Sequence, residues 1–244
     1  AGFDPVGCFM RLGSPGEALD TPLHADHADA CDVPLSPKGS TPLRISKQGC
    51  CSINDAADAR LVAAHLNIPL YICNFKREFG RVIDYFVDEY AAGRTPNPCV
   101  RCNDWLKFGK LHEYAKQIDA DFAASGHYAR VERVGEDLAL LRGLDHDKDQ
   151  SYVLFGVPRE KLARILLPIG GLRKAAVRAI AERLKLPVFN KPDSQEICFV
   201  PDNDYAGFVT RRLGDSAPTE GDLVSESGEV VGTHGGHHRF TIGQ

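Results

Sequence analysis

The sequence is poor in the features that mark several large classes of protein. It has one methionine, Met10, and one tryptophan, Trp105, in 244 residues. No apolar run approaches the roughly 20 residues that a membrane-spanning helix needs, which excludes a membrane partner. The start has no basic–apolar–small pattern of a signal peptide. Basic residues are not in excess either, since 29 Lys and Arg stand against 33 Asp and Glu. This excludes a globally basic nucleic-acid binder but leaves room for a local basic face.

What remains is an ordinary globular composition. Hydrophobic residues make up 43% of the chain and charged residues 25%, enough for one large domain or two modest ones. The eight cysteines are spread over a long chain, so the protein is not a small disulfide scaffold. A reducing cytosol suits this cysteine usage best, and we expect a cytoplasmic protein.

Strand-like and helix-like segments alternate over the first half of the chain. Asn54 is a candidate helix cap. In the helix that follows it, Ala57, Leu61 and Ala64 form the predicted inner face. In the next helix the predicted inner face consists of six apolar residues between 79 and 90. Such alternation favours an α/β fold, a parallel sheet with helices on both faces. The predicted strands are 5–12, 68–73 and 121–125, and the predicted helices are 55–66, 79–90 and 104–118.

The second half changes character. A hairpin is expected at 129–134 and 138–142, and an amphipathic helix at 172–186. In that helix Ala176, Val177, Ile180 and Leu184 face inward, and Arg173, Lys174, Arg178 and Lys185 face outward. Glycine-rich, strand-like sequence then follows, so we place a domain boundary between about 200 and 216. The predicted domains are 1–205, with a probable loop insertion at 14–48, and a truncated β-rich domain at 206–244.

Cys99 and Cys102 form the sharpest local motif, a CxxC within GRTPNPCVRCN. Two thiols at this spacing can bind a metal, act as a redox pair or lower each other's pKa. Pro96 and Pro98 predict an extended loop that presents them. A chance CxxC is the plain alternative in a cysteine-containing chain, and no second CxxC completes a zinc site.

Cys198 lies in the polar stretch KPDSQEICF. Alone it is more typical of a small buried hydrophobe. Together with Cys99 and Cys102 it would supply three thiols, which suit either persulfide and disulfide chemistry or ligation of an iron–sulfur cluster.

Two further segments point to ligands. Gly126, in SGHY, follows a predicted parallel strand, at the sheet edge where nucleotides bind, although a simple turn is about as good an interpretation. Lys148 and Gln150, in a charged loop before a helix, are candidate contacts to phosphates and bases. Residues 158–191 hold nine Lys and Arg against two Glu, the pattern expected for an RNA-binding face or for a solvated helix surface.

Five blocks together resemble one family, the bacterial tRNA-specific 2-thiouridylases (MnmA/TrmU). They occur in the family's order and cover nearly the whole chain. The blocks are GRTPNPCVRCN at 93–103, ASGHYAR at 124–130, DKDQSYVLF at 147–155, KPDSQEICFV at 191–200 and GTHGGHHRFTIGQ at 232–244.

The resemblance implies an ATP-pyrophosphatase-type domain, a small central domain and a C-terminal barrel. It implies a transferase that uses ATP and Mg²⁺ to adenylate the C2 oxygen of the wobble uridine of tRNA, and then replaces that oxygen with sulfur from a cysteine desulfurase or a sulfur-relay protein. Cys102 resembles the catalytic thiol and Cys198 the persulfide carrier, and the two would end as a disulfide. The resemblance implies that the target base is contacted by Asn97, Pro98 and Cys99. It implies that tRNA is contacted by Lys148, Asp149 and Gln150. The implied contacts to the adenine nucleotide are Met10 and Gly126.

The sequence departs from the family pattern at three points. The family's phosphate-binding loop should precede the strand at Pro5 and is absent, so we expect a fragment that does not adenylate RNA by itself. Most of the barrel is missing. Cys99 stands where many relatives carry Asp, which keeps a [4Fe–4S] cluster on Cys99, Cys102 and Cys198 open beside the persulfide route. Rival interpretations are a non-catalytic tRNA-binding fragment and a module stabilised by a cysteine-bound metal.

Overall fold

The computed structural model describes residues 2–13, 53–193 and 197–242. The expected insertion at 14–48 lies outside the described residues. No helix within the described ranges is long and apolar enough to cross a membrane. The α helices are α1 (Ile53–Leu66), α2 (Lys76–Ala91), α3 (Pro98–Arg101), α4 (Leu111–Gln117), α5 (Lys174–Arg183) and α6 (Tyr205–Leu213). The strands are β1 (Gly7–Arg11), β2 (Leu70–Asn74), β3 (Ala123–Ala124), β4 (Ala129–Val134), β5 (Asp137–Arg142), β6 (Ile165–Leu166), β7 (Gly221–Val224) and β8 (Val230–His234).

Parallel strand pairs confirm the predicted α/β class. β1 pairs with β2 in parallel from Gly7↔Leu70 to Arg11↔Asn74, and β3 pairs with β6 in parallel at Ala123↔Ile165. Among the described strands these pairs form two separate two-stranded sheets. An edge-to-face contact between Phe3 and Phe122, with ring centroids 6.0 Å apart, joins the segments that lead into β1 and β3.

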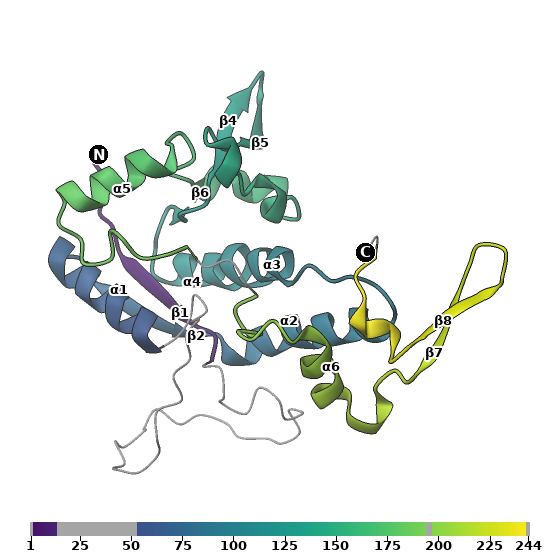
Figure 1. Ribbon diagram of the computed structural model, residues 1–244. Coiled ribbons are helices and arrows are strands. Elements are labelled where there is room, and N and C mark those ends of the chain that lie inside the picture. Colours follow the sequence, from purple (N-terminus) through teal and green to yellow (C-terminus); the bar gives the residue numbers. More distant parts are fainter. Residues whose placement is uncertain (1, 14–52, 194–196, 243–244) are drawn as a thin grey trace, which may run out of the picture.

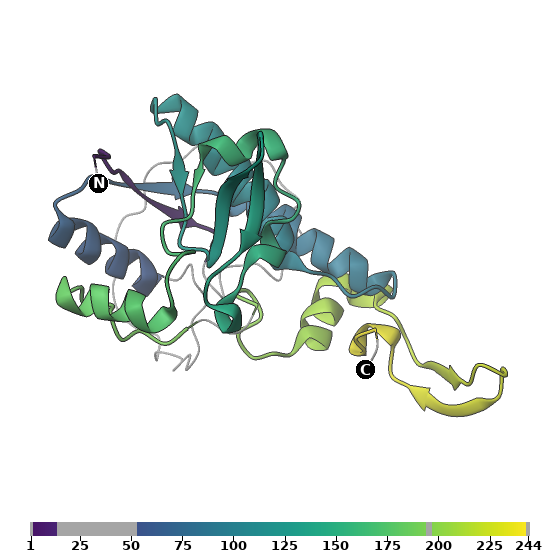
Figure 2. The ribbon, with the colours of Figure 1, turned by 90° about the horizontal axis from the view of Figure 1, so that it is seen from above.

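Antiparallel hairpins make up the remaining strands. β4 and β5 pair from Ala129↔Arg142 to Val134↔Asp137, which confirms the predicted hairpin. β7 and β8 form a second hairpin that projects away from the helices in both views (Figures 1 and 2). This second hairpin belongs to the predicted β-rich region. The helix before it, α6, contributes Phe208 and Val209 to the apolar core around α2.

The core of the molecule is built around α2. Its predicted inner face is confirmed, because the apolar side chains recur every three or four residues and all six are buried. Aromatic rings from other segments complete this α2 core. The buried members are Leu12, Phe79, Val82, Ile83, Phe86, Val87, Tyr90, Leu106, Phe199, Val200, Phe208 and Val209.

The predicted inner face of α1 is wrong. Ala57, Leu61 and Ala64 are exposed, and Ala63 is the buried residue, with Val62 half-buried beside it. Alanine, valine and leucine occur all round this helix, so periodicity could not choose between faces. The helix also begins at Ile53, so Asn54 lies within it rather than at its cap.

The amphipathic helix at 172–186 is shorter than predicted, and α5 has no buried residue. Val177 and Ile180 are half-buried as expected, whereas Ala176 and Leu184 are exposed. Lys174, predicted to face outward, is half-buried because it pairs with a carboxylate described below.

Candidate functional site

The CxxC motif lies at the start of a helix, so the predicted extended loop is wrong. The helix begins at Pro98 and continues through a π-type segment (Cys102–Lys110) into α4. The side chain of Asn97 caps it by accepting a hydrogen bond from the Val100 N–H at 3.1 Å. Proline suits the first helical position because its missing N–H would have no partner there. The pair Asn97-Pro98 is therefore a helix-start pattern that was already present in the sequence.

The two cysteines of the motif differ in their surroundings. Cys99 is exposed, whereas Cys102, almost one turn later, is partly buried and packs against the α2 core. Cys198 is also partly buried and packs against the same core, next to the buried Phe199. Cys102 and Cys198 therefore both border the α2 core, and Cys99 is not among the residues packed against it.

The same geometry does not supply a ready metal site. Within the ranges that the structure describes, no group of three or more His, Cys, Asp or Glu side chains is arranged to hold a metal ion. A [4Fe–4S] cluster needs converging thiolate ligands. Cys99, Cys102 and Cys198 do not provide them in this arrangement, so we derive no step from a cluster.

Met10 and Gly126, the two predicted contacts to the adenine nucleotide, lie near the carboxyl ends of two parallel strands. Met10 is close to the carboxyl end of β1, opposite Cys73 of β2, and Gly126 follows β3 directly after Ser125. A Cβ atom at Gly126 would have Ile169 Cδ1 as its nearest neighbour, at 3.9 Å. Because nothing crowds this position, the backbone is open to a flat ligand, which fits an adenine nucleotide.

His127 is a buried part of this loop that the sequence analysis left without a role. It is 5% exposed, and its Nδ1 lies 2.7 Å from the Ser125 Oγ. Burial, helped by the nearby charge of Lys107, lowers its pKa to about 3. The imidazole is therefore neutral at physiological pH, and it holds the turn after β3 rather than exchanging protons.

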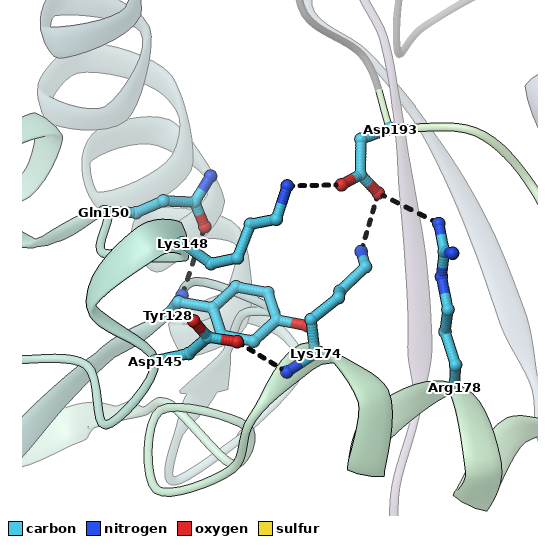
Figure 3. A network of polar contacts seen from close by, with 7 residues as sticks. All are labelled: Tyr128, Asp145, Lys148, Gln150, Lys174, Arg178 and Asp193. Atoms are coloured by element: carbon cyan, nitrogen blue, oxygen red, sulfur yellow. Dashed lines mark hydrogen bonds and ion pairs between the residues drawn. The ribbon is translucent and has the colours of Figure 1, made fainter.

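The candidate tRNA contacts form a tightly bonded loop (Figure 3). Gln150 accepts from the Tyr128 N–H through its side chain at 3.1 Å and donates its own N–H to the Tyr128 carbonyl. Asp149 accepts from the Gly143 N–H at 2.9 Å and from the Ser151 hydroxyl at 2.9 Å. The carboxylate of Asp149 and the amide oxygen of Gln150 thus shape the loop.

Lys148 points to a carboxylate that the sequence analysis did not single out. Asp193 lies 3.1 Å from the Lys148 ammonium, 2.7 Å from that of Lys174 and 3.9 Å from the guanidinium of Arg178 (Figure 3). Hydrogen bonds from Lys174 and Lys148 hold the pKa of Asp193 below its usual value. No periodic pattern could reveal this contact, because Asp193, Lys148 and the helix α5 are three separate segments of the chain.

The basic stretch at 158–191 is partly neutralised in the same way. Besides the two cations at Asp193, Lys191 pairs with Asp55 and Asp58 of α1, and Arg159 pairs with Asp137 at 2.7 Å. Carboxylates from elsewhere in the sequence therefore reduce the local positive charge that the sequence suggested.

Comparisons with known proteins agree on one family. The family described as the tRNA methyl transferase HUP domain matches residues 24–202. The protein of Rhodopirellula baltica named tRNA-specific 2-thiouridylase MnmA is 44% identical over all of this chain and 62% of its own length. Proteins of the same name from Geobacter metallireducens and Leptospira biflexa are 53% identical over 80% of the chain and 46% identical over all of it. The chain spans 53%, 58% and 62% of the lengths of these three relatives.

Proposed function

Because the chain belongs to the tRNA methyl transferase HUP domain family, we propose that it is the catalytic part of an ATP-dependent sulfurtransferase that 2-thiolates the wobble uridine of tRNA. The relatives named above carry the name of this activity. The observation that carries the proposal is that Cys102 and Cys198, distant in sequence, pack against one core.

ATP would transfer its adenylyl group to the C2 oxygen of the uridine and release pyrophosphate, which makes that oxygen a leaving group. Met10 and Gly126 would hold the adenine end. We assign no residue to Mg²⁺, which would accompany the nucleotide.

Sulfur would pass to the base through two cysteines. The terminal sulfur of a persulfide on Cys198 attacks C2, the C2–S bond forms, and AMP leaves with the former C2 oxygen. The Cys102 thiolate then attacks the Cys198 sulfur, and the sulfur–sulfur bond to the base breaks. The thiolated base is released, and a Cys102–Cys198 disulfide remains to be reduced. The helix start at Pro98 favours anionic sulfur near its first turns.

The remaining residues would position the tRNA. Asn97, Pro98 and Cys99 are the cap and first residues of the helix that carries Cys102, and they would contact the target base. Lys148, which is partly exposed, would exchange its contact with Asp193 for a phosphate. A cysteine desulfurase or a sulfur-relay protein would load Cys198.

The test is a thiolation assay with unmodified tRNA, ATP, Mg²⁺ and a persulfide donor, with 2-thiouridine measured by mass spectrometry. It is run with the chain alone and with the family's phosphate-binding segment joined to it. Cys102→Ser and Cys198→Ser should each lower the rate by at least about 100-fold, because each removes an obligatory sulfur atom. Cys73→Ser, in the β2 strand, is the matched control and should retain activity. Thiolation by Cys102→Ser at the normal rate would disprove the assigned roles.

A further inference from the structure

Two arginines and two aromatic rings gather beside the CxxC helix. The guanidinium carbon of Arg81 lies over the indole of Trp105, 5.1 Å from the ring centroid. That of Arg101 lies 5.1 Å from the centroid of Tyr85 and 5.6 Å from that of Trp105. The two rings meet edge to face with centroids 6.0 Å apart. We call these four residues the aromatic–arginine cluster.

The cluster adjoins the residues that the proposed function places at the target base. Trp105 is three residues after Cys102 on the same helix, and both pack against the α2 core. The backbone N–H of Asn97 donates to the Tyr85 hydroxyl at 3.4 Å. The cluster is thus linked to both ends of the first turns of the CxxC helix.

Arg81 is held by the ring rather than by a carboxylate. It is exposed, and within the described residues no salt bridge forms on it. Neighbouring acids on α2 have other partners, since Asp84 pairs with Arg212 at 3.0 Å and Glu89 with Arg94 at 2.7 Å. Its positive charge is therefore not neutralised by these groups.

Arg101 has a weak acidic neighbour. The carboxylate of Asp104 lies 3.7 Å from its guanidinium, and burial raises the pKa of Asp104. The other oxygen of Asp104, Oδ1, is buried and has no hydrogen-bond partner among the described residues. Both guanidinium groups thus lie over the indole of Trp105, and the ion pair of Arg101 with Asp104 is long.

This arrangement has the chemistry of a single-stranded RNA contact. A guanidinium stacked on a ring keeps its N–H edge available for a phosphate, and its plane can stack on an unpaired base. Aromatic side chains interleaved with arginines are the typical surface for unstacked nucleotides of RNA loops. An acidic protein partner would pair with the two arginines but would have no need of the two aromatic rings.

We propose that the aromatic–arginine cluster binds the unpaired nucleotides that flank the target uridine, with Arg81 on a backbone phosphate. The inference rests on the proposed function and deepens it by naming the surface that receives the loop. RNA duplex without a loop should not occupy the cluster, because its bases are already stacked on each other.

Trp105 is the sole tryptophan of the chain, so its fluorescence reports on this surface alone. The probe is an RNA hairpin whose unpaired loop contains the target uridine, and a fully paired duplex of equal length is the reference. Affinity is measured separately by the anisotropy of a dye on the RNA. The hairpin should quench Trp105 fluorescence, and the duplex should leave it unchanged.

Arg81→Ala should weaken hairpin binding about tenfold and reduce the slope of log affinity against log salt by about 1, as expected for one lost phosphate contact. Arg77→Ala is the matched control, since Arg77 lies on the same helix, is 91% exposed and pairs with Glu78. It should change hairpin binding less than twofold. Thermal unfolding of both variants checks that they are folded.

The outcomes separate this inference from the proposed function. Hairpin binding with unchanged Trp105 fluorescence, and with Arg81→Ala equal to Arg77→Ala, would overturn the cluster assignment and leave the proposed function standing. Equal quenching by the duplex would overturn the specificity for unpaired nucleotides. If the chain bound no RNA at all, both proposals would fail. If Arg81→Ala lost binding to a persulfide-carrying protein while its hairpin binding stayed unchanged, the cluster would be assigned to a protein partner instead.

Discussion

Two regions of the molecule are held together in different ways. Around α2, the ring of Phe86 is fully buried and contacts four other aromatic rings, with centroid distances from 5.0 to 6.3 Å. At α5 no residue is buried, and Lys174 and Arg178 of the helix form ion pairs with Asp193. Apolar packing fixes the positions of side chains closely, whereas exposed ion pairs can exchange a partner at little cost.

This difference matches the division of labour in the proposed reaction. Cys102 and Cys198 pack against the α2 core, where sulfur chemistry needs fixed geometry. Lys148 lies in the ion-pair region, where the proposed function has a tRNA phosphate replace Asp193. The comparison can be tested by asking how much each region contributes to stability and how that contribution depends on pH.

The largest effect is expected in the α2 core. Phe86→Ala should lower the free energy of unfolding by about 3–5 kcal/mol, because it removes a fully buried ring and leaves a cavity. Urea unfolding measures the change, and it should be nearly the same at pH 7 and pH 5, because no titratable group is removed. Phe155→Ala is the control, since Phe155 is 75% exposed and should cost less than about 0.5 kcal/mol. Equal losses in the two variants would mean that the rings around α2 do not form the stabilising core.

A buried titratable group gives an intermediate effect that depends on pH. The pKa of His127 is about 3 in the folded protein and about 6.5 in the unfolded chain. Because the folded-state pKa is lowered, the unfolded chain binds a proton at His127 before the folded protein does. The protein therefore has its full stability above about pH 6.5, and stability falls as the pH drops from there toward 3. At pH 5 the loss through His127 should be about 2 kcal/mol.

His127→Gln cannot take up a proton, so it should remove this loss. The measurement is the free energy of unfolding at pH 7 and pH 5 for both proteins. His146→Gln, at a loop histidine, is the control and should leave the loss unchanged. A pH dependence that stays the same in His127→Gln would show that the buried imidazole is not its source.

Sequence patterns succeeded where one face of an element differs strongly from the other. The inner face of α2 was predicted correctly because aromatic and branched side chains lie on one side and charges on the other. In α1 the alanines and leucines are spread all round, and the face around Leu61 was chosen wrongly. The start of the helix at Pro98 was missed because proline was taken as a sign of extended chain, although Asn-Pro is also a helix start.

The candidate site divides in a similar way. The pairing of Cys102 with Cys198 came from the family resemblance, since no local pattern relates residues so far apart. Asp193 could not be predicted, because its three cationic partners converge only in the folded chain. The aromatic–arginine cluster has the same origin, as its members come from two helices that pack side by side.

The smallest effect is expected for Asp193→Asn. At pH 7 it should lower the free energy of unfolding by about 1 kcal/mol, because partly exposed ion pairs contribute little even when a carboxylate serves three cations. The lowered pKa of Asp193 means that its contribution is complete above about pH 4 and is lost as the pH falls through the folded-state pKa. The difference between wild type and variant should therefore be constant from pH 7 to about 5, decrease as the pH falls through the folded-state pKa, and shrink in high salt. Asp137→Asn, at a 70%-exposed residue with one partner, is the control and should have almost no effect. A loss as large as that of Phe86→Ala would mean that ion pairs hold α5 as firmly as rings hold α2, and the exchange of Asp193 for a phosphate at Lys148 would then be too costly to accompany RNA binding.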